Sequence, residues 1–116
     1  MKNFGFTETQ RFVKRAEKIL GEEIISELQL YLCNYPDDGA IIPNSGGIRK
    51  MRWASSGRGK RGGARIIYYF ADKAGRILLL DIYAKNDKEN LSVSELKDFK
   101  EAVNYWLERL ENLGEL

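Results

Sequence analysis

Residues 64–85 read ARIIYYFADKAGRILLLDIYAK, two apolar runs on either side of a short polar turn. Residues 64–71 are β-branched and aromatic, and residues 76–85 are rich in leucine and isoleucine, which are compositions typical of strands. Residues 72–75 between them carry turn chemistry. The stretch therefore predicts an antiparallel β-hairpin.

A further strand is predicted before this hairpin, at residues 48–54, where the sequence alternates with a period of two. Met51 and Trp53 alternate with Lys50 and Arg52, so both cations project from the face opposite the apolar pair. Together with the hairpin, this strand predicts a three-stranded antiparallel meander.

Helical spacing flanks the meander on both sides. Residues 7–21, with a predicted cap at Thr7, and residues 22–36 form a helical hairpin, preceded by a possible short strand at residues 3–6. Ser92, with Glu95 three residues later, predicts the start of a last helix. Its apolar stripe consists of Leu96, Phe99, Val103, Trp106, Leu110 and Leu113. The predicted fold class is α+β: an N-terminal helical hairpin, an antiparallel β-meander and a C-terminal helix.

Length and composition limit what the chain can be. Its 116 residues, 43% of them hydrophobic, suit one domain spanning residues 1–116. The single Cys33 cannot form an internal disulfide, and the absence of histidine excludes the usual zinc sites and any mechanism that needs imidazole. No apolar segment is long enough to cross a membrane, so we expect a cytoplasmic protein without a membrane partner.

Charge is segregated along the sequence. Seven of the 19 basic residues and none of the 17 acidic ones lie in residues 46–65, so this basic block carries +7 and the remainder −5. Its cations are Arg49, Lys50, Arg52, Arg58, Lys60, Arg61 and Arg65. A block of one sign indicates binding of a polyanion through its phosphates. Residues 55–63 are glycine-rich, but they join two strands and lack the lysine and hydroxyl residue that end a nucleotide-binding P-loop.

Five side chains are candidates for chemistry on one sheet face: Lys50, Arg52, Arg65, Tyr83 and Lys85. Cleavage of RNA through its own 2′-hydroxyl needs no metal or cofactor, only a base, an acid and charges that stabilise the phosphate. Arginine suits the phosphate oxygens, whereas a lysine crowded by other cations, or Tyr83, suits proton transfer. Asp81 and Asp87 are expected to be ion-pair partners instead.

Three stretches resemble the RelE/HigB toxins of bacterial type II toxin–antitoxin systems: GGIRKMR at residues 46–52, GRGKRGGARIIYYF at residues 57–70 and IYAKN at residues 82–86. The resemblance implies a metal-independent endoribonuclease that cuts messenger RNA in the ribosomal A site and inhibits translation. It also implies a cognate antitoxin, expected to be a helix-turn-helix protein similar to HigA.

Position by position, the resemblance assigns roles. Lys50 and Arg52 match the family's paired strand cations at the scissile phosphate, and Arg65 matches its transition-state arginine. Tyr83 and Lys85 match a Tyr-x-Lys-Asn motif of HigB-like members, while RelE has a different arrangement, so the general base stays open. The cations expected to grip RNA backbone are Arg49, Arg58, Lys60 and Arg61.

Two other functions fit the same sequence. ParE-like members of the superfamily poison DNA gyrase without nuclease residues, and fold alone does not separate them from nucleases. A non-catalytic RNA-binding module would also need only the basic block. The set of Lys50, Arg52 and Arg65 favours the nuclease.

Overall fold

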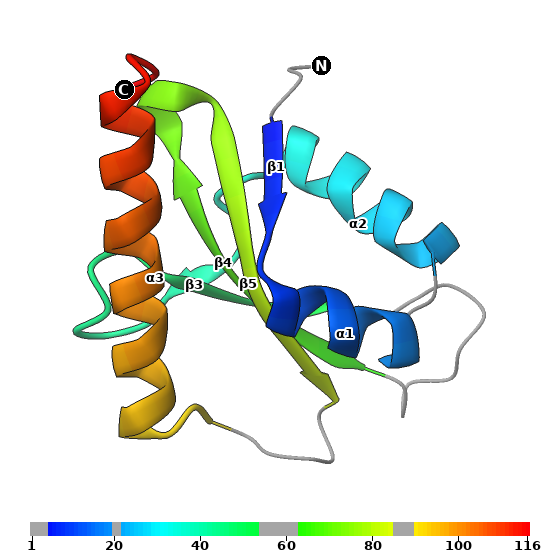
Figure 1. Ribbon diagram of the computed structural model, residues 1–116. Helices are drawn as coiled ribbons and strands as arrows, with labels where there is room; N and C mark the ends of the chain where they lie inside the picture. Colours follow the sequence, from blue (N-terminus) through cyan, green and yellow to red (C-terminus); the bar gives the residue numbers. More distant parts are fainter. Residues whose placement is uncertain (1–4, 20–21, 54–62, 85–89) are drawn as a thin grey trace.

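The computed structural model describes residues 5–19, 22–53, 63–84 and 90–116, with the side chains of residues 22–24 left out (Figure 1). Four expected site residues therefore lie outside the described residues: Arg58, Lys60, Arg61 and Lys85. The elements, in chain order, are β1 (Gly5–Glu8), α1 (Gln10–Ile19), α2 (Glu22–Asn34), β2 (Ala40–Ile41), β3 (Arg49–Trp53), β4 (Ala64–Ala71), the 3-10 turn η2 (Asp72–Ala74), β5 (Arg76–Ala84) and α3 (Val93–Asn112).

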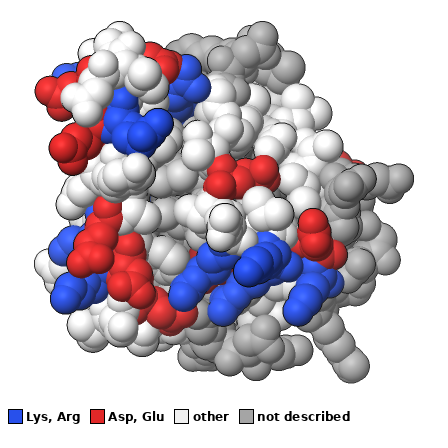
Figure 2. All heavy atoms as spheres, in the orientation of Figure 1, with Lys and Arg blue, Asp and Glu red and all other residues white. Residues whose placement is uncertain are grey.

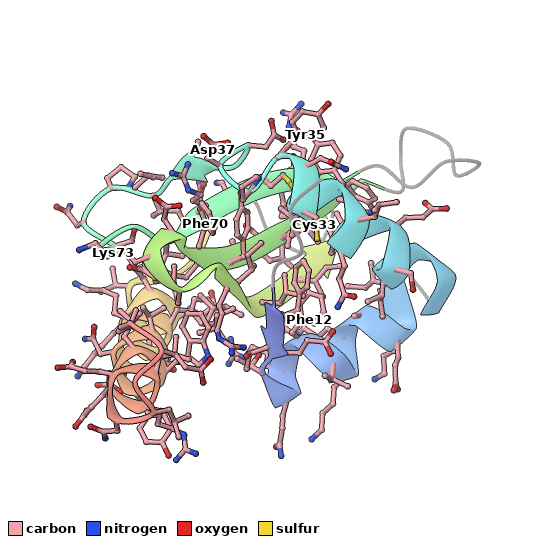
Figure 3. All side chains as sticks on the ribbon, turned by 90° about the horizontal axis from the view of Figure 1, so that it is seen from above. Phe12, Cys33, Tyr35, Asp37, Phe70 and Lys73 are labelled. Atoms are coloured by element: carbon pink, nitrogen blue, oxygen red, sulfur yellow. The ribbon has the colours of Figure 1, made fainter. Side chains whose placement is uncertain are left out.

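The strands form one sheet in the order β1-β5-β4-β3-β2. The predicted meander is confirmed, since β3 pairs antiparallel with β4, and β4 pairs antiparallel with β5 across the turn η2. Strand β2 extends the meander antiparallel to β3, and β1 adds to its other edge parallel to β5. Helices α1 and α2 cover one face of the sheet and α3 covers the other (Figures 1 and 3).

The two helical layers enclose separate apolar cores. On the α1 and α2 side, Phe12 lies between α1 and the sheet and is fully buried (Figure 3). On the α3 side, four residues of the predicted stripe are buried: Phe99, Val103, Trp106 and Leu110. Because helices cover both faces, residues 77–83 of β5 are buried along the whole run, as an apolar strand in the middle of a sheet requires.

The ends of two helices test the predicted caps. Ser92 caps α3 in a full capping box with Glu95, as predicted. The predicted cap at Thr7 was wrong, because Thr7 lies in β1 and pairs with Leu78. Thr9 takes the role instead: its hydroxyl accepts the N–H of Phe12 at 3.1 Å. At the C-terminal end of α3, Leu113 follows the last helical residue and is 65% exposed, so it does not extend the buried apolar stripe.

Strands β4 and β5 contain one irregularity that matters for the site. Ile67 pairs with Asp81, but the next residue, Tyr68, pairs with Leu79, so Leu80 is an extra residue in β5. A bulge of this kind changes the direction in which neighbouring side chains point. Leu80 and Tyr83 accordingly both lie in the core beneath α3, although they are three residues apart.

Candidate functional site

Three side chains on neighbouring strands form a row across the sheet. Arg52 on β3 lies directly opposite Arg65 on β4, and Arg65 lies directly opposite Tyr83 on β5. Directly paired residues project from the same face, so all three share the α3 face of the sheet. With strands about 4.8 Å apart, the backbone positions of Arg52 and Tyr83 are separated by about 10 Å.

Exposure falls along this Arg52–Tyr83 row. Arg52 is exposed, Arg65 is half-buried and Tyr83 is 1% exposed, so the row runs from solvent to the edge of the α3 core. Lys50 lies two residues before Arg52 on the same face, and its Nζ donates to Asn90 Oδ1 at 3.3 Å. The structure therefore brings together four of the five residues expected to carry chemistry.

The side chain of Tyr83 is buried, whereas a tyrosine in a strand commonly keeps its hydroxyl in water. Burial raises the pKa of Tyr83, the carboxylates of Asp81 and Glu95 raise this pKa further, and Arg65 lowers it. A raised pKa keeps the phenol protonated at neutral pH. Tyr83 is consequently suited to donate a hydrogen bond or a proton, and it is poorly suited to act as a phenolate base.

The two arginines of the row carry like charges at directly opposed positions, an arrangement that destabilises a sheet when no anion is present. Among the ion pairs of the described residues, neither Arg52 nor Arg65 takes part. Their combined field favours an anion lying over both strands, and guanidinium groups match phosphate oxygens in bidentate fashion.

Arg49 lies apart from this row. It precedes Lys50 and so projects from the other sheet face, where its guanidinium donates to the carbonyls of Asp37 at 3.1 Å and Gly39 at 2.7 Å. The hydroxyl of Tyr68 reinforces the same turn: it accepts the N–H of Gly39 and donates to the carbonyl of Pro36. This geometry gives Arg49 a structural role at the entry to β2, separate from the expected contact with RNA.

A second set of cations lies on α1, outside the basic block that the sequence analysis identified. Figure 2 shows lysines and arginines gathered over α1, whose basic residues are Arg11, Lys14, Arg15 and Lys18. Their spacing of three and four residues places them on one side of a helix, a signal that was readable from the sequence. Arg11 and Arg15 both reach Asp81, which confirms that this carboxylate is an ion-pair partner.

Two features that would indicate other classes of protein are absent from the described part of the chain. No group of three His, Cys, Asp or Glu side chains there is arranged to hold a metal ion. None of the helices in those ranges combines the length and the apolar character that crossing a bilayer needs.

Comparisons with known proteins identify the family and a similar fold. A family model described as "RelE toxin of RelE / RelB toxin-antitoxin system" matches residues 8–115. Among solved structures, the fold is similar to that of the E. coli toxin RelE, an arginine double mutant in the free state, with a TM-score of 0.54 and 16% identity. The match covers 76% of this chain and 90% of the E. coli chain. At this identity the solved structure supports the fold alone.

Proposed function

The chain belongs to the RelE toxin family of toxin–antitoxin systems, and from this premise we propose that it is a ribosome-dependent endoribonuclease that cuts messenger RNA in the ribosomal A site. The observation that carries the proposal is the Arg52–Tyr83 row, in which two guanidinium groups without an ion pair among the described residues lead to a buried, protonated phenol. The matched region includes every residue of this row.

The proposed reaction is a transesterification within the RNA. The 2′-oxygen forms a bond to the adjacent phosphorus while the bond from phosphorus to the 5′-oxygen breaks, which leaves a 2′,3′-cyclic phosphate and a 5′-hydroxyl. A base takes the proton of the 2′-hydroxyl, and an acid gives a proton to the departing 5′-oxygen. Negative charge develops on the phosphate between these two steps, and fixed cations stabilise it.

The residues of the site divide these tasks. Arg52 and Arg65 bind the scissile phosphate and stabilise the developing charge. Tyr83 supplies the proton to the leaving oxygen, since its raised pKa keeps the phenol protonated. Lys50 or Lys85 is the candidate base. The loop cations Arg58, Lys60 and Arg61, proposed on sequence resemblance, would hold RNA backbone outside the reacting phosphate.

Partners follow from the same proposal. The ribosome presents the messenger, so the protein is expected to act in the cytoplasm, where translation takes place. The family implies a cognate antitoxin, and the resemblance to HigB-like sequences favours a helix-turn-helix antitoxin of the HigA type. We expect the antitoxin to prevent ribosome entry, because a bulky partner on so small a toxin obstructs docking without touching the Arg52–Tyr83 row.

The test is to add the purified protein to ribosomes translating a defined messenger and to map new 5′ ends by primer extension, with DNA supercoiling by gyrase measured in parallel. We expect cleavage within the A-site codon that requires the ribosome, and no effect on gyrase. Inhibition of gyrase without cleavage would overturn the proposal in favour of a ParE-like toxin. Binding to ribosomes without cleavage would overturn it in favour of a non-catalytic RNA-binding module.

Two variants control for charge. Arg52→Met removes one cation from the row, whereas Lys73→Met removes one from the exposed turn η2, at the far end of the β4–β5 hairpin from Arg65 and Tyr83. Both lower the net charge equally, so both weaken general attraction to RNA. Only Arg52→Met is expected to lose cleavage at saturating ribosomes.

A further inference from the structure

A buried carboxylate on β5 pairs with two cations of α1. Asp81 on β5 is fully buried, and its Oδ1 accepts the N–H of Ile82 at 2.8 Å. Arg15 Nη1 lies 3.4 Å from each carboxylate oxygen, and Arg11 Nη1 lies 3.7 Å from Oδ2. Because a buried charge is costly without partners, Asp81 depends on these contacts with α1.

Arg11 reaches further than Arg15. The same Nη1 lies 3.6 Å from Glu95 Oε2, and its guanidinium carbon lies 5.4 Å from the centre of the Phe99 ring. Both of these residues belong to the first two turns of α3, on the opposite side of the sheet from the α1 core. Arg11 therefore connects β5, α1 and α3 through one side chain.

The contact at Glu95 involves the cap of α3. Glu95 Oε1 accepts the N–H of Ser92 at 3.0 Å, while the Ser92 hydroxyl accepts the N–H of Glu95 at 3.0 Å. One carboxylate thus closes the capping box with one oxygen and meets Arg11 with the other. Arg11 therefore contacts the residue that closes the capping box at the start of α3.

Tyr83 lies near the contacts that Arg11 makes with Asp81, Glu95 and Phe99. It follows Asp81 by two residues in β5 and shares the buried cluster beneath α3 with Phe99. The charges of Arg65, Asp81 and Glu95 all act on its phenol. A shift of the first turn of α3 would consequently change both the packing and the charges around Tyr83.

We propose that Arg11 is a positioning residue, which holds the first turn of α3 over Tyr83 and so keeps the phenol aligned with Arg65. The proposal rests on the proposed function for its effect on RNA cleavage. Small displacements of a reacting group lower the rate of a chemical step steeply, while binding of the substrate elsewhere is unaffected. Loss of Arg11 should therefore lower kcat and leave KM for ribosomes in place.

Arg15 is a matched control within the same helix. It lies one turn after Arg11 and meets the same carboxylate, and the side chains are similarly exposed, 40% for Arg11 and 42% for Arg15. Its ion pair in the described residues is with Asp81, without the link to Glu95 that Arg11 makes. A role limited to the ion pair with Asp81 would therefore affect both arginines alike.

The experiment compares Arg11→Gln with Arg15→Gln in the full chain. For Arg11→Gln we expect kcat for messenger cleavage to fall about 10- to 100-fold, with KM for ribosomes changed by less than about twofold. Arg15→Gln should keep kcat within about twofold. Hydrogen exchange at the amides of residues 96–99 should be faster in Arg11→Gln than in Arg15→Gln, and Arg11→Lys should recover part of kcat.

Equal loss of kcat in the two glutamine variants would overturn the proposal, and so would full kcat in Arg11→Gln. If the unaltered protein does not cleave messenger, the proposed function fails on its own account. The exchange comparison then decides the placement of α3: faster exchange in Arg11→Gln alone supports Arg11 as the residue that holds the turn, and equal exchange overturns it.

Discussion

Replacing Arg65 by methionine should separate activity from stability. Methionine keeps an unbranched side chain of similar reach in β4 but removes the guanidinium, so the strand and its apolar contacts are expected to persist. In the proposed reaction Arg65 faces the phosphate while negative charge develops. We therefore expect Arg65→Met to lose messenger cleavage and to fold at least as well as the unaltered protein.

The two magnitudes come from the position of Arg65 in the sheet. Removing one donor to a developing oxyanion lowers kcat by about 10²- to 10³-fold, or about 2.7–4 kcal/mol. Arg65 lies directly opposite Arg52, and like charges in that relation destabilise a sheet by roughly 0.2–1 kcal/mol. The free energy of unfolding should accordingly stay level or rise by up to about 1 kcal/mol.

Urea unfolding and primer extension on translating ribosomes measure the two effects on the same samples. Arg49→Met should have the opposite effects on stability and activity, because the guanidinium of Arg49 donates to the carbonyls of Asp37 and Gly39. We expect that variant to lose about 1–3 kcal/mol of stability and to retain the kcat of its folded fraction. An Arg65→Met protein that is clearly destabilised yet cleaves normally would refute the reasoning.

Three further predictions concern other groups. Burial raises the pKa of Tyr68 from 10.0 to about 12. The neutral phenol therefore contributes stability that is complete below about pH 10 and is lost as pH rises toward about pH 12. In urea titrations, Tyr68→Phe should show a smaller alkaline loss of stability than the unaltered protein. The same variant should lose about 1–3 kcal/mol at neutral pH, because the buried N–H of Gly39 loses its acceptor. Tyr83→Phe should lower kcat for messenger cleavage by about 10²- to 10⁴-fold. The cleavage rate of the unaltered protein should not fall between about pH 7 and about pH 9, since the raised pKa of Tyr83 keeps its phenol protonated there. Dissociation constants for ribosomes should rise steeply with salt in filter-binding titrations, and a flat dependence would contradict an electrostatic footprint.

Local signals explain what the sequence predicted well. The β4–β5 hairpin, the alternation in β3 and the capping box at Ser92 depend on residues within a few positions of one another, and all three were confirmed. The shared face of Arg52, Arg65 and Tyr83 follows from the same two-residue period. Local chemistry therefore indicated the shared face, whereas the strand register sets the three residues opposite one another.

Long-range pairings explain what the sequence did not predict. Strand β1 ends at Glu8 because residues 5–8 pair with β5 more than 70 positions away, and this pairing moved the helix cap from Thr7 to Thr9. The burial of Tyr83 depends on α3, which folds back over β5. Nothing in the sequence around Asp81 says that its partners are Arg11 and Arg15, because their ion pairs form only once α1 lies against the strand.

The chemical nature of the RNA ends formed on the ribosome tests the central claim most directly. The upstream messenger fragment, isolated after cleavage by the purified protein and analysed by mass spectrometry, should end in a 2′,3′-cyclic phosphate. Attack by the 2′-hydroxyl produces that end with the arginines and the proton donor of the Arg52–Tyr83 row and with Lys50 or Lys85 as the base. A fragment that ends in a 3′-hydroxyl would contradict the account, because that end requires water or another external nucleophile at the phosphate.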